Sequence, residues 1–333
     1  MTARILLTHT PEMRRNYYGE DALAGLAKLG EVILHEADEP LDAAGLVRAA
    51  EGCRLIVSDR NTPGYGEAFD KLPDLEAFLR VAVDIRNVDV ASASRAGVLV
   101  THAGRSWVPA VSELVIGHMI NIARGISNAV AAYRRGESAP AILGRQLNGS
   151  TAGIIGYGPL GRNVADLALV LGMKVLVHDP YVKVERAGIE QASLDDLVRR
   201  SDFVVPLAVA TAETENLIGE KQLAAMKPTA YLINLSRGNL VDEVALERAL
   251  DERRIAGAAL DVGRAADQMP SLALAARPDV FATPHIGGLT RPGIEGQALE
   301  TVEQAGEILA GRIPPGAVNA AEAHRLGRAH KAR

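Results

Sequence analysis

The sequence predicts an α/β protein with two domains, each built around a parallel sheet. The chain has 333 residues, 48% of them hydrophobic and 23% charged, so it can bury a large core and is too long for one compact domain of typical size. Short apolar runs alternate with amphipathic stretches, which is the pattern of buried parallel strands covered by helices. A glycine-rich turn also joins a strand-like run to a helix-like segment.

The first alternating series occupies the N-terminal third of the chain. Its strand-like and helix-like stretches are, in order, 5–7, 21–29, 32–34, 41–50, 55–57, 79–83, 88–97 and 98–100. Continuous apolar strands between helix-period segments imply a parallel sheet with both faces covered. We therefore expect an α/β fold for the first domain.

A longer helical pattern follows, from Pro109 to about Arg135, and proline suits the first turn of a helix. The second series of strands and helices then runs over residues 151–285. Residues 296–309 predict a last helix, closed by Gly311 and two prolines. We expect this helix to return to the first domain.

The predicted domain boundaries follow from this order. Residues 1–101 and 290–333 are expected to form one discontinuous domain, because the last helix returns to the first series. Residues 102–289, which contain the glycine-rich turn, are expected to form the other domain.

The glycine-rich turn is the run Gly156-Tyr157-Gly158-Pro159-Leu160-Gly161, which follows the apolar run 151–155. One glycine permits a tight turn, a second lets backbone N–H groups approach a pyrophosphate, and the third lets the helix pack on the strand. Asp179 ends the next apolar run, where a carboxylate can accept hydrogen bonds from an adenosine ribose. The sequence therefore predicts a dinucleotide site, and it favours NAD over NADP because Asp179 would repel a 2′-phosphate.

Two residues after later strands fit hydride transfer to a keto acid. That reaction needs a cation to hold the carboxylate and polarise the carbonyl, and an acid to protonate the new alkoxide beside the nicotinamide. Arg237 follows the apolar run 232–235 and can bind a carboxylate with two hydrogen bonds. His285 follows the run 280–282, and a histidine with an unperturbed pKa of about 6.5 exchanges protons at physiological pH. Each residue taken singly is also compatible with a structural role.

Composition argues against several other classes of protein. The net charge is −5 with both signs interspersed, so no nucleic-acid surface is expected, and the basic tail Arg325–Arg333 fits a frayed terminus. No apolar stretch is long enough to span a membrane, and the N-terminal apolar run is too short for a signal peptide. Cys53 is the only cysteine, which fits a buried structural thiol and a cytoplasmic protein. No metal site is predicted.

Together these segments resemble the D-isomer-specific 2-hydroxyacid dehydrogenase family over nearly the whole chain. The motifs that carry the resemblance are, in order, Gly156–Gly161 with Asp179, Asn234–Gly238, Gly257–Val262, Thr283–Gly288, and Pro314-Pro315 with Val318-Asn319. The resemblance implies two Rossmann-like domains with parallel sheets, a flavodoxin-like substrate domain and an NAD-binding Rossmann domain, with the active site in the cleft between them. It also implies a homodimer in which the helix starting near Pro109 packs against its partner.

The resemblance further implies roles for individual residues. Arg237 is expected to bind the substrate carboxylate and carbonyl, His285 to act as general acid and base, and Asp261 to lie on the cofactor side near the nicotinamide. The expected NAD-binding residues are Gly156, Tyr157, Gly158, Pro159, Leu160, Gly161 and Asp179.

The sequence departs from the family pattern beside His285. Family members usually place a glutamate five residues after the aspartate of the Leu-Asp-Val motif, where it pairs with the catalytic histidine, but position 266 is alanine here. Asp267 and Gln268 are the alternative substitutes. A carboxylate would stabilise the imidazolium, whereas an amide would orient the ring with little charge stabilisation. The related formate dehydrogenases use glutamine in that role.

Arginines near strand ends predict an anionic substrate. Arg60 follows the third strand-like run, Arg86 lies where the family has a glycine-rich loop, and Arg105 precedes Trp107 before the long helix. Guanidinium groups suit carboxylate, phosphate or sulfonate. We therefore expect a small substrate with a second anionic group, with Arg60 and Arg86 as its candidate ligands; simple surface solvation is the alternative for each.

The leading hypothesis is an NAD-dependent enzyme that interconverts a D-2-hydroxy acid and its 2-keto acid. One alternative is a nucleotide-sensing binding protein, like the corepressors that share this fold. Another is a formate- or phosphonate-type dehydrogenase, which is favoured if Gln268 faces His285. The identity of the acid and the direction of the reaction stay open.

Overall fold

The structure is a computed structural model that describes residues 2–327. The chain divides into two compact units, Met1–Trp107 with Thr290–Arg333 (unit 1) and Val108–Leu289 (unit 2). The first boundary predicted from sequence, between residues 101 and 102, falls inside a strand, Leu99–His102. The chain passes from unit 1 to unit 2 where that strand and its following loop have ended, at the start of a long helix.

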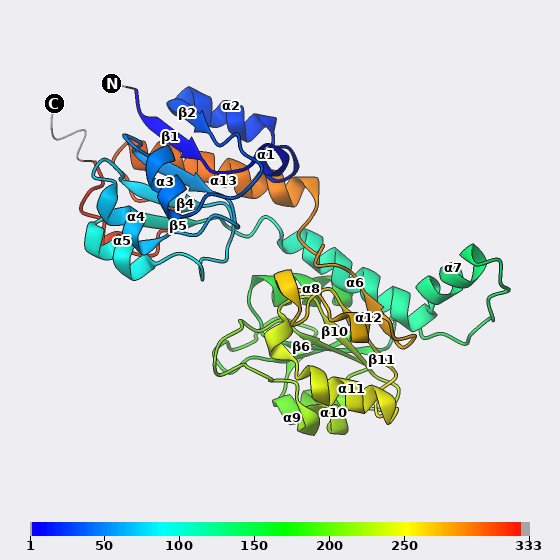
Figure 1. Ribbon diagram of the computed structural model, residues 1–333. Helices are drawn as coiled ribbons and strands as arrows, with labels where there is room; N and C mark the ends of the chain where they lie inside the picture. The colour runs from blue at the N-terminus through cyan, green and yellow to red at the C-terminus, as the bar shows by residue number, and fades with distance from the viewer. Residues whose placement is uncertain (1, 328–333) are drawn as a thin grey trace. The chain divides into compact units, whose positions relative to one another are not determined.

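Unit 1 contains a five-stranded parallel sheet of order β2-β1-β3-β4-β5, which is the flavodoxin-like order (Figure 1). Its strands are β1 (Arg4–Leu7), β2 (Glu31–Leu34), β3 (Leu55–Ser58), β4 (Ala77–Arg80) and β5 (Leu99–His102). Its helices are α1 (Pro11–Tyr17), α2 (Glu20–Leu29), α3 (Ala43–Ala49), α4 (Gly66–Lys71), α5 (Val90–Ala96) and α13 (Arg291–Leu309). A short 3₁₀ turn, η3 (Ala320–Glu322), follows α13.

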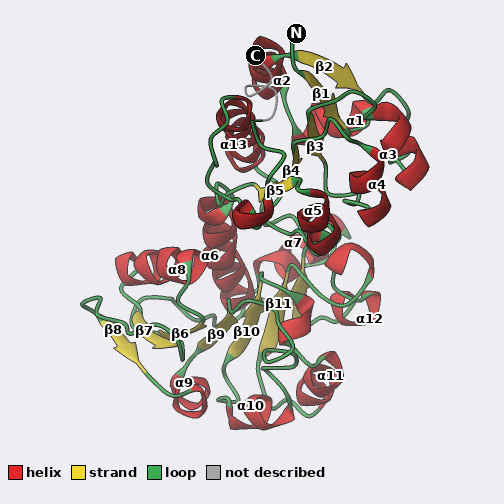
Figure 2. Cartoon of the chain, turned by 90° about the vertical axis from the view of Figure 1, so that its left-hand side faces the viewer, coloured by secondary structure: helices red, strands yellow, loops and turns green. Residues whose placement is uncertain are grey.

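The alternation of side chains along a strand builds two cores in unit 1. Ile5 and Leu7 face one side of the sheet, where they pack with residues of α2 and α13. Leu6 faces the other side, with residues of α3, α4 and α5. Figure 2 shows the sheet between these two groups of helices.

Unit 2 contains a seven-stranded parallel sheet of order β12-β11-β10-β9-β6-β7-β8. Its strands are β6 (Thr151–Ile155), β7 (Lys174–His178), β8 (Ile189–Gln191), β9 (Phe203–Pro206), β10 (Tyr231–Asn234), β11 (Gly257–Leu260) and β12 (Val280–Ala282). The strand order changes direction between β6 and β9, and open α/β sheets bind ligands beyond the carboxyl ends of the strands at such a point.

Helices cover both faces of the second sheet (Figures 1 and 2). They are α6 (Val108–Arg124), α7 (Ile126–Arg134), α8 (Pro159–Val170), α9 (Leu194–Arg200), α10 (Glu220–Ala225), α11 (Glu243–Asp251) and α12 (Leu272–Ala275), with 3₁₀ turns η1 (Gly238–Leu240) and η2 (Ala266–Gln268). The predicted α/β class with two parallel sheets is confirmed.

Two predicted helices differ in their limits. The helix expected over residues 109–135 is broken into α6 and α7 at Gly125, whose φ of 63° lies in the left-handed region that favours glycine. The last helix begins at Arg291 rather than near residue 296, because the Thr290 side chain accepts a hydrogen bond from the Gly293 N–H and caps it. Pro292 suits the first turn of this helix, but Gly293 weakens the helical signal, and the pattern from sequence therefore missed the cap.

Other expectations concern single features. Cys53 is fully buried, and burial raises the pKa of its thiol to about 11, as expected of a structural cysteine. No helix within residues 2–327 is both long and apolar enough to cross a membrane. Of the basic tail Arg325–Arg333, residues 328–333 lie outside the described part of the chain.

Candidate active site

The predicted residues of unit 2 lie at one edge of its sheet. Gly156 follows β6, Asp179 follows β7, Arg237 follows β10, and Asp261 follows β11. His285 comes shortly after β12. Because all seven strands are parallel, these positions share the carboxyl-terminal edge of the sheet.

Two of the three glycines of the turn after β6 are required by the surrounding backbone, and the third faces open space. At Gly156 a Cβ atom would lie 2.7 Å from the backbone nitrogen of Ala208, in the loop after β9, and φ is 98°. At Gly161 a Cβ atom would overlap the carbonyl oxygen of Gly156, so the third glycine lets α8 pack on the turn. At Gly158 a Cβ would meet nothing within 4 Å, which leaves open space for a ligand beside the helix N-terminus.

Asp179 is held beside this turn by backbone donors. Its Oδ2 atom accepts a hydrogen bond from the Tyr157 N–H (2.7 Å), and its Oδ1 atom accepts from the N–H groups of Tyr181 (2.9 Å) and Val182 (3.1 Å). The glycine turn and the carboxylate are therefore joined directly. The open space at Gly158 and the carboxylate beside it fit a dinucleotide.

Arg237 lies half-buried at the start of the turn η1. Its Nη1 atom donates to the carbonyl oxygen of Ser236 (2.8 Å), and its own carbonyl oxygen accepts from the Asn234 side chain (3.0 Å). The next residue, Gly238, comes so close to Gly263 that a Cβ would overlap the carbonyl oxygen of Gly263. The turns after β10 and β11 thus pack against each other and fix the backbone from which Arg237 extends.

Asp261 is buried and organises the segment that carries His285. Its Oδ1 atom accepts from the Thr283 hydroxyl (2.6 Å) and from the Ile286 N–H (2.9 Å), and its Oδ2 atom accepts from the Gly287 N–H (2.8 Å). These donors flank His285 on both sides. The observed partners give Asp261 a positioning role, and the nicotinamide-side role implied by the resemblance stays a prediction.

Residues missed in the sequence extend this network. His118, buried on α6, places its Nε2 atom 3.0 Å from the Thr283 hydroxyl, and its ring packs edge-on against Phe281. Burial lowers the pKa of His118 below its ordinary value, and the nearby charge of Asp261 offsets only part of this effect. The one signal in the sequence was a polar residue on the apolar face of a helical pattern, which by itself is more typical of a core histidine.

His285 has a main-chain partner. Its Nδ1 atom lies 2.8 Å from the carbonyl oxygen of Asp267, so Nδ1 carries the hydrogen and donates it. Proton exchange at the other ring nitrogen, Nε2, stays a prediction. The Asp267 side chain is exposed, and a catalytic role for its carboxylate stays a prediction.

The backbone around this contact is strained. Asp267, Gln268 and His285 have φ values of 54°, 56° and 54°, in the left-handed region that side-chain-bearing residues seldom adopt. Such residues gather at functional sites because the surrounding structure must hold them in place. The Oε1 atom of Gln268 is buried without a hydrogen-bond partner in the described chain.

Arg60 and Arg86, the candidate substrate ligands, lie in unit 1. Arg86 donates to both carboxylate oxygens of Asp84, with its shortest bond at 2.6 Å, so its charge is compensated within its own loop. The guanidinium carbon of Arg60 lies 5.9 Å from the centre of the Tyr17 ring on α1. Substrate contact by either arginine stays a prediction.

Arg80, which the sequence analysis did not single out, supports the loops that carry these two arginines. It is fully buried at the end of β4 and donates to the Ser58 hydroxyl (3.2 Å) and to the Asn87 side-chain oxygen. Asn87 in turn donates to the carbonyl oxygen of Arg60 (2.9 Å). A charged residue inside the apolar run 79–83 was its signal in the sequence.

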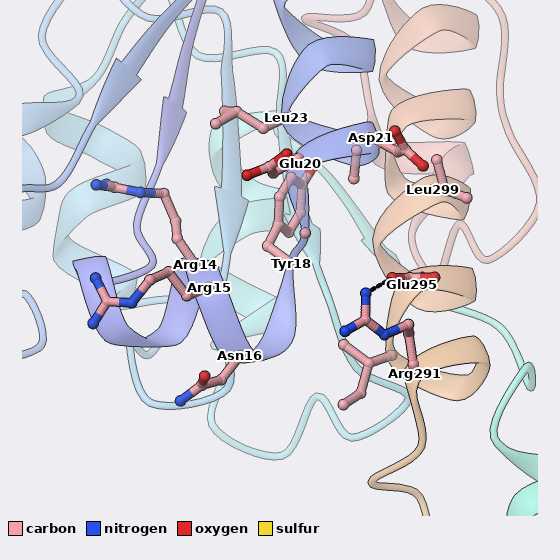
Figure 3. A pocket seen from close by; sticks show the side chains of 13 residues that line it. Arg14, Arg15, Asn16, Tyr18, Glu20, Asp21, Leu23, Arg291, Glu295 and Leu299 are labelled. Carbon is pink, nitrogen blue, oxygen red and sulfur yellow. Dashed lines mark ion pairs between the residues drawn. The ribbon is translucent and has the colours of Figure 1, made fainter.

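A cavity of about 890 Å³ in unit 1 lies between α1, α2 and α13 (Figure 3). It is lined by Arg14, Arg15, Asn16, Tyr18, Gly19, Glu20, Asp21, Ala22, Leu23, Arg291, Ile294, Glu295 and Leu299. Its lining contains three arginines and three carboxylates. None of the residues predicted for the site lines it.

The doubly wound sheet of unit 2, with its glycine turn, the adjoining carboxylate of Asp179 and the histidine segment, defines a dinucleotide-binding domain of the dehydrogenase class. The family model described as D-isomer specific 2-hydroxyacid dehydrogenase, NAD binding domain, matches residues 116–287. The chain belongs to this family.

Comparisons with individual proteins agree with this assignment to the family. The chain is 33% identical to D-3-phosphoglycerate dehydrogenase of Methanocaldococcus jannaschii over 90% of its own length and 57% of that protein's. It is 34% identical to glyoxylate reductase of Thermococcus litoralis over 82% of its own length and 85% of that protein's. The solved structure of the TT0316 protein from Thermus thermophilus matches with a TM-score of 0.84 and 32% identity, over 95% and 99% of the two chains. The chain thus spans about half the length of several curated relatives that it matches.

Proposed function

We propose that this protein is an NAD-dependent oxidoreductase that interconverts a D-2-hydroxy acid and its 2-keto acid. The observation that carries the proposal is the placement of Arg237 and His285 at the same sheet edge as the glycine turn, with His285 oriented by the carbonyl oxygen of Asp267. Relatives named D-3-phosphoglycerate dehydrogenase and glyoxylate reductase support the same reaction class.

In this proposal the bound NAD supplies or accepts the hydride. Arg237 binds the substrate carboxylate and polarises its carbonyl, because a guanidinium presents two donors to a planar anion. His285 gives a proton from Nε2 to the alkoxide during reduction and takes it back during oxidation, while the hydrogen on Nδ1 stays hydrogen-bonded to the Asp267 carbonyl oxygen. Asp261 and Thr283 hold the segment in place.

We also propose that the substrate carries a second anionic group that unit 1 recognises. Arg60 is the better candidate for its ligand, because its loop is braced by Asn87 and Arg80. A panel of 2-keto acids with one or two anionic groups, followed by NADH absorbance, tests both parts. Activity on any keto acid supports the enzyme, and a preference for dianionic acids that is lost in Arg60→Ala supports the second group.

A second candidate is a nucleotide-sensing binding protein. It is favoured by one observation, the uncharged main-chain partner of His285 where the family has a glutamate. A formate- or phosphonate-type dehydrogenase would also use an uncharged partner. The assay distinguishes these candidates: NADH binding without turnover of any keto acid supports the sensor, and oxidation of formate or phosphite supports the third class.

We propose a homodimer that uses the region of α7. Large exposed apolar side chains gather there, with exposed fractions of 67% at Tyr133 and 104% at Leu143, and α7 and the segment after it stand out from the sheet of unit 2 (Figure 1). Exposed apolar patches of this kind mark contact surfaces. Sedimentation of the wild type and Leu143→Asp tests this, with Leu272→Asp, exposed on α12, as the matched control.

A further inference from the structure

Arg162 occupies an unusual position in the first turn of α8. It is the fourth residue of this helix and is exposed. Its Nε atom donates to the carbonyl oxygen of Tyr157 (3.1 Å), and its guanidinium carbon lies 5.1 Å from the centre of the Tyr157 ring. These two contacts direct the side chain back toward the glycine turn. In the described part of the chain its Nη1 and Nη2 groups have no hydrogen-bond partner.

The start of α8 is unfavourable for an isolated helix. A cation in the first turn opposes the helix dipole, which favours negative charge at this end. The first turn contains no acidic residue, and Gly158 at the N-cap offers no side chain to accept hydrogen bonds from the free backbone N–H groups. A local arrangement that breaks these rules is expected where a ligand compensates for them.

An anion at this helix end would satisfy every one of these groups. The N–H groups of Gly158, Leu160 and Gly161 are not bonded within the helix, whereas Pro159 has no N–H to offer. The turn therefore has one donor fewer than a helix N-terminus without proline. The two unoccupied Nη groups of Arg162 replace that donor and add a positive charge.

We propose that Arg162 binds the pyrophosphate of the dinucleotide. The inference rests on the cofactor-binding part of the proposed function. Tyr157 links Arg162 to the ribose carboxylate, because its N–H donates to Asp179 while its carbonyl oxygen and ring hold the guanidinium. A single residue of the turn thus positions a cation for the pyrophosphate and an anion for the ribose.

Binding measurements test this without any turnover. NADH, ADP-ribose and adenosine are titrated against the full-length wild type and the Arg162→Met variant. Methionine keeps an unbranched apolar side chain and removes the charge. Affinity for NADH and ADP-ribose should fall about tenfold to a hundredfold, the effect of losing hydrogen bonds to a charged group, and adenosine, which has no phosphate, should bind within about twofold of wild type.

Two further variants sharpen the result. Arg162→Lys should give an intermediate loss, because lysine keeps the charge but not the planar fork. Arg186→Met removes the same charge from a loop of unit 2, where the arginine pairs with Asp166 on α8, and should leave NADH binding unchanged. Without ligand, Arg162→Met should unfold close to the wild-type temperature, because the loss of the two contacts with Tyr157 and the removal of an unfavourable dipole contact oppose each other.

Three outcomes would contradict the assignment. Unchanged NADH affinity in Arg162→Met overturns the proposal for Arg162 alone and leaves the dehydrogenase proposal standing. An equal loss of affinity for adenosine and NADH shows that the residue only supports the turn. A wild-type protein that binds none of the three ligands overturns the cofactor assignment itself.

Discussion

The Nδ1 atom of His285 lies 2.8 Å from the main-chain carbonyl oxygen of Asp267. A carbonyl oxygen accepts a hydrogen bond whatever the side chain attached to its residue, so the orientation of the imidazole does not depend on a carboxylate. The missing glutamate at position 266 therefore does not leave His285 unsupported. The imidazole of His285 is instead oriented by a neutral group, the main-chain carbonyl of Asp267.

The first prediction follows from this contact. Asp267→Asn should keep the pH dependence of kcat/KM for keto-acid reduction, because the carbonyl is uncharged and stays in place. His285→Ala should lower kcat/KM about a hundredfold to ten-thousandfold. A pH profile whose alkaline limb moves to lower pH in Asp267→Asn would instead identify the carboxylate as the partner, with Gln268→Ala as the control at the neighbouring position.

For Arg237, replacement by alanine should reduce kcat/KM by at least about a hundredfold while the Kd for NADH stays within about twofold of wild type. The reason is that in the proposed function the guanidinium binds the substrate and the transition state rather than the dinucleotide. Lysine should restore little activity, since a point charge cannot form the two parallel hydrogen bonds. Full activity in Arg237→Lys would contradict the two-bond role.

Asp261→Asn tests the positioning of the histidine segment. The carboxylate accepts from the Thr283 hydroxyl and from the N–H groups of Ile286 and Gly287, and an amide would point its own N–H groups at one of these donors. We expect a loss of about 1–3 kcal/mol in unfolding free energy and a fall in kcat that exceeds the change in NADH affinity. Thr283→Ser, which keeps the hydroxyl, is the matched control and should remain active.

Cofactor choice depends on Asp179. The wild type should use NADH with a higher kcat/KM than NADPH, because the half-buried carboxylate repels a 2′-phosphate. Asp179→Asn should lower the ratio of kcat/KM for NADH to kcat/KM for NADPH by about tenfold, mainly through weaker NADH binding. Asp166→Asn, on the adjoining helix, should leave this ratio unchanged. Equal efficiency with both cofactors in the wild type would show that the carboxylate does not select the ribose.

His9 predicts a pH dependence of stability. It is buried against Tyr18, and burial lowers the pKa of His9 to about 4, from an ordinary value of 6.5. Below pH 6.5 the unfolded chain gains a proton that the folded chain refuses, so stability is lost as the pH falls from 6.5 to 4, by up to about 3 kcal/mol. His9→Phe should remove this part of the decline in denaturant titrations. His324 is exposed, and His324→Phe should show the same decline in stability as the wild type.

Local chemistry was enough to predict the class of fold and the geometry of the turn at which we propose that the cofactor binds. The alternation of apolar runs predicted two parallel sheets, and the spacing of Gly156, Gly158 and Gly161 before Asp179 predicted the turn and its carboxylate. These features depend on residues close together in the sequence, where strand period, turn geometry and helix start are set. The ends of parallel strands then had to meet at one edge, which placed Arg237 and His285 beside them.

The tertiary structure decided what distant residues do to one another. It paired Asp261 with the backbone around His285, placed His118 on α6 against Thr283, and neutralised Arg86 with Asp84. It also broke the long helix at Gly125. Hydrogen bonds and burial of this kind depend on three-dimensional distance and on the direction of each side chain, and a one-dimensional pattern contains neither. The sequence therefore determined the sheet edge at which the proposed site lies. The packed fold determined the hydrogen-bond partners of each side chain at that edge.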